Sequence, residues 1–362
     1  MDNSNFSDML INRYKVVSAM SGTSLDGIDI LYAEYWKEDD WKFRILDFET
    51  RAYSKSWLNR LKQLTQFSIK ELKEIDFEYS KYLAEELLYF ITKKSISDID
   101  FIASHGHTAL HKPDEGYTYQ MGNQQIVANI LNKKLICDFR IQDVKLGGQG
   151  APLVPIGDKL LFSEYYSCIN LGGFANISFD KKEERIAFDI CPVNVVLNYY
   201  VSQLGFDYDD NGNIAKTGKI CSPLLEQLNT LSFYEKEPPK SLGLEWVEAK
   251  VFPLIKEFNL VIKDILNTYV EHVAIQISKY LQKNNTKALL TGGGTYNSYL
   301  LERISQRSKT KIVVPSKTII EYKEALIFGL LGVLRDKNEV NCLASVTGAS
   351  KDHSSGIIFY PN

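Results

Sequence analysis

The chain has 362 residues, more than one hydrophobic core usually serves, so we expect two domains. Hydrophobic residues make up 44% of it and charged residues 24%, which is the balance of a soluble globular protein. A formal net charge of -3 provides no large basic face and argues against nucleic acid as a partner.

The cysteines and the apolar runs indicate a cytoplasmic protein. The five cysteines lie far apart, and no Cys-x-x-Cys pair occurs, which argues against a disulfide framework or a structural zinc site. Residues 1–13 are polar and acidic and lack the basic start and apolar stretch of a signal peptide. No apolar run approaches the ~20 residues that span a bilayer, so we expect no membrane partner.

A glycine-containing turn lies between two predicted strands, residues 14–20 and 28–34. Its glycines allow a tight turn and close approach to a ligand, and successive exposed amides in such a turn bind anions. A carboxylate in the same turn, Asp26, is suited to a cation that bridges two phosphates. The stretch therefore indicates a nucleotide phosphate site, and the alternative is an ordinary hairpin with a polar turn.

The rest of the first half reads as further strands and helices that end at a cluster of chain breakers. Apolar residues recur every three or four positions over residues 69–94, which predicts a helix with one buried stripe. The other expected elements are strands at 41–48, 100–108 and 117–121 and a helix at 123–131 that leads to residues 134–140. The glycine-rich stretch 146–152 then predicts a domain boundary, with domains at 1–145 and 146–362.

The second half begins with the same order of elements. Strand, glycine turn and strand recur over residues 167–179, followed by a third strand at 185–190 and a helix at 193–204. The loop at 207–213 is acidic but lacks the spacing of an EF-hand, so we interpret it as a plain loop. Further on we expect a long helix at 261–282 with His272 packed beside it, a buried strand ending in Gly292, Gly293 and Gly294, a strand at 311–315, and an apolar helix at 322–335. The glycines after the buried strand point backbone amides toward an anion or a nucleotide.

Taken together, the motifs resemble those of the anhydro-N-acetylmuramic acid kinases, within the actin, hexokinase and heat-shock ATPase superfamily. The resemblance covers residues 16–361. It rests on Met20 to Asp29, Ser104-His105-Gly106, Asp138-Phe139-Arg140 continuing to Asp143, Gly147 to Pro155, Asn170-Leu171-Gly172-Gly173 with Ala175 to Ser178, Pro238 to Ser241, Gly292-Gly293-Gly294 with Asn297, and Glu324-Ala325-Leu326.

The resemblance implies an α/β fold with two duplicated actin-like (ribonuclease H-like) ATPase domains and a nucleotide cleft between them. It implies an enzyme that uses ATP and Mg²⁺ to phosphorylate 1,6-anhydro-N-acetylmuramate while water opens the anhydro bridge. The product is N-acetylmuramate 6-phosphate, in peptidoglycan recycling, and the family habit favours a homodimer.

The resemblance also assigns roles to individual residues. It places the general base at Asp189, for which a strand-end or helix-capping carboxylate is the alternative. It implies that the ATP phosphates are bound by Gly22, Thr23, Ser24, Leu25, Asp26, Gly27, Ile28 and Asp29, with Asp26 near the magnesium. It implies that the rest of the nucleotide is bound by Gly172, Gly173, Gly292, Gly293, Gly294 and Asn297, and that the sugar is bound by His105, Gly106, Arg140 and Glu324. The alternatives are an orienting role for His105, a salt bridge from Arg140 to Asp138 or Asp143, and a favourable first-turn charge for Glu324.

The sequence departs from the family pattern beside the expected base. Ile190, Cys191 and Val193 replace a threonine and two glycines, and His107 stands where glutamine is common. We interpret Cys191 as a small buried hydrophobe and not as a nucleophile. The altered run leaves open a kinase for another anhydro-sugar such as levoglucosan, and a non-kinase actin-like ATPase is a further alternative.

Overall fold

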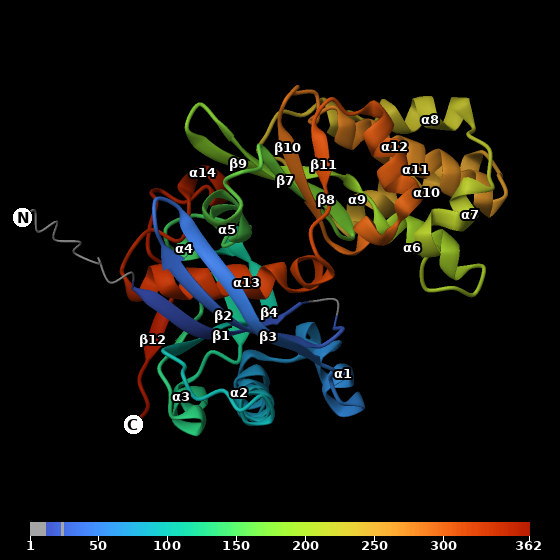
Figure 1. The fold of residues 1–362 in the computed structure, drawn as a ribbon. Helices are drawn as coiled ribbons and strands as arrows, with labels where there is room; N and C mark the ends of the chain where they lie inside the picture. The colour runs from blue at the N-terminus through green and yellow to red at the C-terminus, as the bar shows by residue number, and fades with distance from the viewer. Residues whose placement is uncertain (1–11, 23–24) are drawn as a thin grey trace, which may run out of the picture. The chain divides into compact units, whose positions relative to one another are not determined.

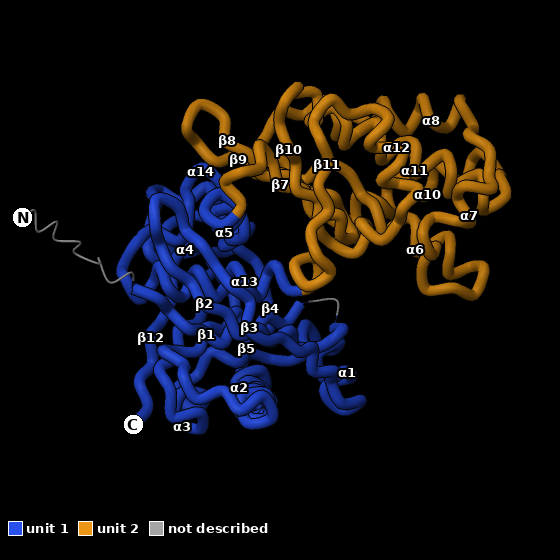
Figure 2. Tube along the Cα trace, viewed as in Figure 1, with its two compact units in different colours: residues 1–161, 322–362 blue, residues 162–321 orange. Residues whose placement is uncertain are grey.

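The computed structural model describes residues 12–22 and 25–362 (Figure 1). Two of the predicted phosphate-site residues, Thr23 and Ser24, lie outside the described residues. The chain forms two compact units, which Figure 2 colours separately. Unit 1 comprises residues 1–161 and 322–362, and unit 2 comprises residues 162–321.

Unit 1 is built on a seven-stranded sheet. Its strands are β1 (Arg13–Ser21), β2 (Ile28–Lys37), β3 (Trp41–Arg51), β4 (Phe101–Lys112), β5 (Tyr117–Met121), β6 (Leu135–Cys137) and β12 (Ile357–Phe359). The order along the sheet is β12-β6-β4-β1-β2-β3, with β5 paired to β4. β1 pairs antiparallel with β2 and parallel with β4, so the hairpin and the end of β4 lie side by side.

Helices cover both faces of the unit 1 sheet (Figure 1). They are α1 (Lys55–Leu61), α2 (Ile69–Lys93), α3 (Gln125–Leu131), α4 (Ile141–Lys145), α5 (Val154–Leu161), α13 (Lys317–Asp336) and α14 (Ala344–Thr347). One face packs on the apolar stripes of α2 and α3. α13 packs on the other face, where Gly329 meets the Tyr35 ring and Gly332 meets Phe101. Because the central strand β1 is buried on both faces, its run from Val16 to Met20 is almost wholly apolar.

Unit 2 is built on a five-stranded sheet with the order β11-β10-β7-β8-β9. The strands are β7 (Ser167–Leu171), β8 (Phe174–Lys181), β9 (Glu184–Pro192), β10 (Lys287–Thr291) and β11 (Lys311–Val313). The helices are α6 (Asn194–Ser202), α7 (Asn213–Lys216), α8 (Ser222–Asn229), α9 (Leu244–Trp246), α10 (Phe252–Glu257), α11 (Ile262–Ser278) and α12 (Ser298–Arg307). Ile169, Ile177 and Phe188 of the sheet share one core with the apolar sides of α6, α11 and α12.

The two sheets repeat one topology. In each, an antiparallel three-stranded meander is extended on one side by two parallel strands: β3-β2-β1-β4-β6 in unit 1 and β9-β8-β7-β10-β11 in unit 2. In both units a turn with glycines joins the first two strands of the meander. The predicted α/β class and the predicted internal repeat are confirmed.

The units divide the chain differently from the single predicted boundary at 145/146. The helix after the breaker cluster, α5, belongs to unit 1. It packs closely on α13, since a Cβ on its Gly157 would lie only 2.4 Å from the side chain of Ile327. The chain also returns to unit 1 at Tyr322, and β12 pairs with β6. Helix α13 begins at Lys317, five residues before the predicted start at 322.

Candidate functional site

The β1–β2 hairpin carries the predicted phosphate site on a tight and strained turn. Ser21 pairs with Ile28 at the end of the ladder, and the Leu25 amide donates to the Gly22 carbonyl at 3.3 Å. Leu25 has a φ of 62°, which a bulky residue rarely adopts outside functional sites. Gly27 cannot be replaced without movement, since a Cβ there would lie 2.7 Å from the Arg51 carbonyl oxygen. Asp26 is exposed on this turn.

A buried polar network anchors the first strand of this hairpin. The Ser21 hydroxyl bonds to the Tyr53 hydroxyl and, at 2.7 Å, to Nδ1 of His107, and Tyr53 in turn bonds to Tyr79 at 3.0 Å. Burial lowers the pKa of His107 to about 4, so its ring is neutral near pH 7. The sequence marked His107 only as a departure from the family. The part played by Tyr53 was missed, because it follows β3, far from any motif.

His105 holds Arg140 in place within unit 1. Arg140 donates from Nε to His105 Nε2 at 2.8 Å and from Nη1 to the Gly150 carbonyl at 2.6 Å. Since an arginine nitrogen can only donate, His105 Nε2 must accept, and its Nδ1 carries the proton that is donated to the Gly106 carbonyl at 2.9 Å. Burial, together with the charge of Arg140, lowers the pKa of His105 well below its usual range. This neutral histidine fits the orienting role.

Among the described residues, the structure does not have the alternative contact expected for Arg140, which was a salt bridge to Asp138 or Asp143. Across residues 12–22 and 25–362, no ion pair joins Arg140 to Asp138 or Asp143. The Asp138 backbone has a φ of 56°, which ends β6 at Cys137. Burial raises the pKa of the Asp138 carboxyl to about 6.

Gly106, also predicted on the sugar side, has a φ of 74°, and a Cβ there would lie 2.3 Å from the Met121 carbonyl oxygen.

Glu324 lies in the interior of α13 and not in its first turn, because the helix begins seven residues earlier, at Lys317. The predicted first-turn alternative is therefore wrong. Its side chain is accessible to solvent. Desolvation by the surrounding protein nevertheless raises the pKa of Glu324, although the charges of Arg140 and Lys323 oppose the rise. Lys323 itself is buried in an ion pair with Asp158 at 2.8 Å.

In unit 2, Asp189 lies on β9 beside the segment after Pro239. Its backbone amide donates to the Lys240 carbonyl at 3.1 Å, and its Oδ2 accepts from the Leu242 amide at 2.8 Å. Burial raises the pKa of the Asp189 carboxyl, and the bond from Leu242 opposes that rise. The carboxylate is partly buried, held by one backbone donor and more basic than usual. Nothing in the sequence pattern of 238–242 predicted this contact.

The residues that depart from the family pattern are core residues. β9 contains a bulge: Asn176 pairs with Asp189 and Ala175 with Cys191, which leaves Ile190 unpaired in the ladder. Ile190, Cys191 and Val193 are all at most 2% exposed and belong to the unit 2 core. Val193 has a φ of −127°, so no left-handed backbone is needed at that position. Burial raises the pKa of the Cys191 thiol, as expected of an inert buried cysteine.

Two glycine turns of unit 2 lie next to each other because β7 and β10 are parallel neighbours. Gly172 and Gly173 join β7 to β8, and the Gly173 carbonyl accepts from the Val193 amide at 2.8 Å. Gly292 has a φ of 84°, and a Cβ there would lie 2.6 Å from Asn170 Oδ1. The structure thus brings the two predicted nucleotide turns together at the ends of their strands.

Three further predictions from the sequence can be followed in unit 2. Asn297 caps α12, since its Oδ1 accepts from the Leu300 amide at 2.9 Å. In the acidic loop, the carboxylate of Asp209 accepts from the amides of Ile214 and Ala215 at 2.8 and 2.9 Å, so it serves the start of α7. His272 is fully buried and bonded to Tyr234 and Asn229, which confirms that it is packed.

Comparison with known proteins identifies the family. A family model described as anhydro-N-acetylmuramic acid kinase matches residues 14–361. The chain belongs to the anhydro-N-acetylmuramic acid kinase family. It is 32% identical over 368 residues to a protein of that name from Aliivibrio fischeri, covering 96% of this chain and 100% of the relative. A second, from Sulfurimonas denitrificans, is 33% identical over 371 residues, covering 95% and 98%. The predicted family, and with it a kinase, is confirmed.

Two solved structures also match the chain, at much lower sequence identity. One is component A of the (R)-2-hydroxyglutaryl-CoA dehydratase of Acidaminococcus fermentans, 11% identical, with a TM-score of 0.45 over 88% of this chain and 97% of the other. Another is a hexokinase of Schistosoma mansoni in complex with glucose, 10% identical, with a TM-score of 0.34 over 88% and 85%. Within the described residues, no helix has the length and apolar character needed to cross a membrane.

Proposed function

We propose that the chain is an ATP-dependent kinase that converts 1,6-anhydro-N-acetylmuramate, ATP and water to N-acetylmuramate 6-phosphate and ADP, in peptidoglycan recycling. The observation that carries this conclusion is the family match over residues 14–361. Within the structure, the support comes from a carboxylate suited to a base on unit 2 and from glycine turns suited to a nucleotide on both units.

Asp189 is the general base in this proposal. It takes a proton from the water whose oxygen attacks the anomeric carbon, and the bond from that carbon to the bridging oxygen breaks. The Leu242 amide fixes the carboxylate through Oδ2 at 2.8 Å, which leaves Oδ1 for the water. Because burial raises the pKa of Asp189, its ionised form is a better proton acceptor than an exposed aspartate.

The freed oxygen on C6 then attacks the γ-phosphorus, and the bond from that phosphorus to the leaving ADP breaks. Such a transfer depends on positioning and on neutralising charge. We assign the phosphates to the turn that includes Gly22, Leu25 and Gly27, whose strained backbone is held by the ladder on both sides. The exposed carboxylate of Asp26 has the oxygen donors that Mg²⁺ prefers, and a bound Mg²⁺ would neutralise phosphate charge there.

On the sugar side, we assign Arg140 and Glu324 to the substrate and a positioning role to His105. Arg140 has its direction set by two acceptors, and Glu324 is open to solvent near it. His105 is buried, and both its ring nitrogens are engaged, which suits a residue that holds the arginine and does not touch the sugar itself.

The altered run beside the base gives no reason to prefer another sugar. Its three departing side chains pack into the core, where they line no surface that a ligand touches. Levoglucosan remains the sharpest comparison, because it shares the 1,6-anhydro bridge and lacks the amide and lactyl groups.

The test is a coupled assay of ADP release with each anhydro-sugar. We expect release with 1,6-anhydro-N-acetylmuramate and little with levoglucosan, and activity on levoglucosan alone would overturn the substrate assignment. Asp189→Asn should bind nucleotide and lose nearly all turnover. The matched control is Asp207→Asn, which makes the same change at an exposed carboxylate of the same unit and should retain full activity.

Two finer features belong to the same proposal. We expect a homodimer, which light scattering on the purified chain will test, and a reducing, cytoplasmic setting. The second is supported by five free cysteines, four of them buried, that form no disulfide within the described chain.

A further inference from the structure

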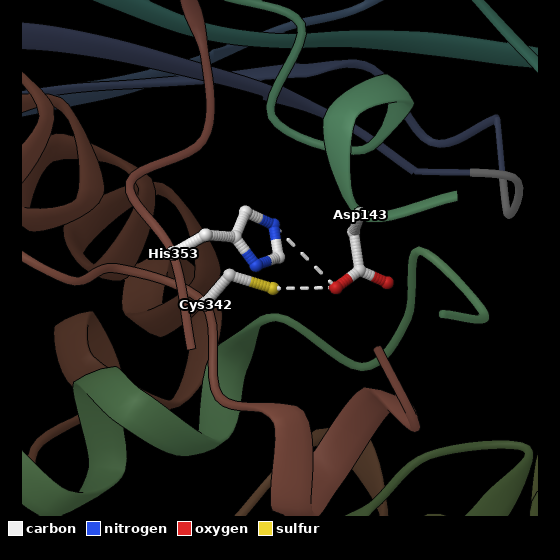
Figure 3. A group of neighbouring side chains, drawn as sticks. All are labelled: Asp143, Cys342 and His353. Carbon is white, nitrogen blue, oxygen red and sulfur yellow. Dashed lines mark hydrogen bonds and ion pairs between the residues drawn. The ribbon is translucent and has the colours of Figure 1, made fainter. Parts of the chain in front are cut away.

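Three side chains from distant parts of unit 1 converge in a buried cluster (Figure 3). They are Asp143 from α4, Cys342 from the segment after α13, and His353 near the C-terminus, and their exposed fractions are 0%, 1% and 6%. Cys342 and His353 face each other across an isolated antiparallel bridge, which places their side chains on the same side. None of the three is used in the proposed reaction.

His353 presents a bare nitrogen to a carboxylate. Its Nδ1 lies 3.1 Å from the Lys351 carbonyl, which can only accept, so Nδ1 carries the proton of the neutral ring. Its Nε2 is then a lone pair, buried and without a hydrogen-bond partner among the described residues, 3.6 Å from Asp143 Oδ1. The Cys342 thiol and the Thr347 hydroxyl both donate to Asp143 Oδ1, so the Nε2 lone pair is the buried atom of the cluster that is left without a partner in the described chain. A cation beside it, either a second proton on the ring or a metal ion, would satisfy it.

The donor set and its spacing suit a metal. The Cys342 sulfur lies 3.0 Å from the same Asp143 oxygen, and the three ligand atoms lie within 4.8 Å of one another. Zinc bonds of ~2.3 Å to sulfur and ~2.0–2.2 Å to nitrogen and oxygen, at tetrahedral angles, separate ligand atoms by roughly 3.3–3.7 Å. The 3.6 Å between His353 Nε2 and Asp143 Oδ1 lies within that range, and the 3.0 Å between the Cys342 sulfur and the same oxygen is slightly shorter than it.

The surroundings orient two of the donors as in a protein metal site. Histidine ligands usually donate their other ring nitrogen to a carbonyl, as His353 does to Lys351. The second carboxylate oxygen of Asp143 accepts from the Gly150 amide at 2.7 Å, which leaves Oδ1 toward the cluster. The Thr347 hydroxyl donates to that Oδ1 at 2.7 Å.

We propose that Asp143, Cys342 and His353 form a structural site for a borderline-soft divalent cation, of which Zn²⁺ is the expected occupant. The sequence did not predict this site, because the three ligands come from three separate segments and include no Cys-x-x-Cys pair. The bound ion would tie the loop that carries Gly150, an acceptor of Arg140, to the C-terminal segment. The inference does not depend on the proposed kinase reaction.

The test uses the full chain, reduced, stripped with a chelator and titrated with Co²⁺ and then Zn²⁺. We expect one Co²⁺ per chain, a thiolate-to-cobalt charge-transfer absorption that Zn²⁺ abolishes, and a higher melting temperature with Zn²⁺. Cys342→Ser and His353→Gln should each weaken binding at least about 10-fold, since even outer-shell changes usually cost that much. Cys221→Ser is the matched control: it changes a less buried cysteine of unit 2 and should leave binding intact.

Asp143 is not the variant of choice, because its carboxylate also holds the Gly150 amide and its loss would disturb the loop itself. If Cys342→Ser fails to fold, X-ray absorption at the zinc edge of the unaltered chain replaces it. One sulfur neighbour at ~2.3 Å is expected. Saturable binding that survives in both folded variants, zinc without a sulfur neighbour, or no saturable binding would each overturn the site; the last result would leave a second proton on His353 as the cation. None of these readouts depends on ADP release, so failure here leaves the kinase assignment standing.

Discussion

Replacing His107 with glutamine should make the protein more resistant to acid. Burial gives His107 a pKa of about 4 in the folded chain, whereas an unfolded histidine titrates near 6.5. Between these two values the unfolded chain binds the proton and the folded chain does not. Buried His107 therefore costs no stability above pH 6.5, and the free energy of unfolding falls as the pH drops from 6.5 toward 4.

The size of the effect follows from that interval. Each pH unit between 6.5 and 4 removes about 1.4 kcal/mol from the free energy of unfolding, about 3 kcal/mol in all. His107→Gln carries no such proton, and its amide still offers a partner to the Ser21 hydroxyl, now 2.7 Å from Nδ1. The variant should be close to the natural protein at pH 7 and should gain on it steadily at pH 6, 5 and 4.5.

Urea unfolding followed by tryptophan fluorescence measures this difference. Trp57 packs edge-on against Tyr79 at 5.4 Å, next to the network that holds His107, so unfolding of unit 1 is visible in its emission. The control is His111→Gln, the same change at an exposed histidine of the same strand, which should show a much smaller pH dependence. A stability difference for His107→Gln that stays constant from pH 7 to 4.5 would refute the reasoning.

Four further substitutions test the site and its support. Asp189→Asn should lower sugar-dependent ADP release by about 10²–10⁴-fold without lowering the urea midpoint, because burial disfavours the charge that the change removes; a matching loss of stability would contradict this. Arg140→Lys should raise KM for the sugar and cost about 1–3 kcal/mol, since lysine cannot serve both acceptors; unchanged kinetics would remove Arg140 from the sugar side. Gly292→Ala, at a φ of 84°, should cost about 1–3 kcal/mol and weaken ADP binding measured by calorimetry. Glu271→Gln removes the charge of a buried carboxylate that pairs with two arginines and should cost about 3–5 kcal/mol while leaving kcat of the folded enzyme unchanged.

Local patterns in the sequence predicted most elements well. The stripe of apolar residues over 69–94 became α2, which ends at Lys93, and its start is fixed by a capping box between Ser68 and Glu71. The strand at 117–121 has the predicted bounds. Where a feature depends on its own turn or strand, as does the turn of Gly292, Gly293 and Gly294 at the end of β10, periodicity and breaker residues are enough to predict its place.

Roles that depend on distant contacts could not be read in the same way. The length of α13 was underestimated because its first turn, from Lys317, has no apolar periodicity, and this placed Glu324 in the wrong turn. The bond from the Leu242 amide to Asp189 joins residues 53 positions apart, and the contact of Cys342 with Asp143 spans 199. The resemblance named Arg140 and Asp189, but only three-dimensional packing revealed what holds each of them.

Unit 1 is interrupted in sequence, whereas unit 2 is one continuous segment. A ribosome therefore makes all of residues 162–321 before it completes α13, which packs on the sheet begun by β1, and before it makes β12, the edge strand of that sheet. Every strand of the unit 2 sheet has been made by Val313, whereas the unit 1 sheet lacks an edge strand until Ile357–Phe359 is made. Removing Ile357–Phe359 would take away this edge strand and leave β6 unpaired on that side, so these last residues finish the sheet that also holds the β1–β2 hairpin.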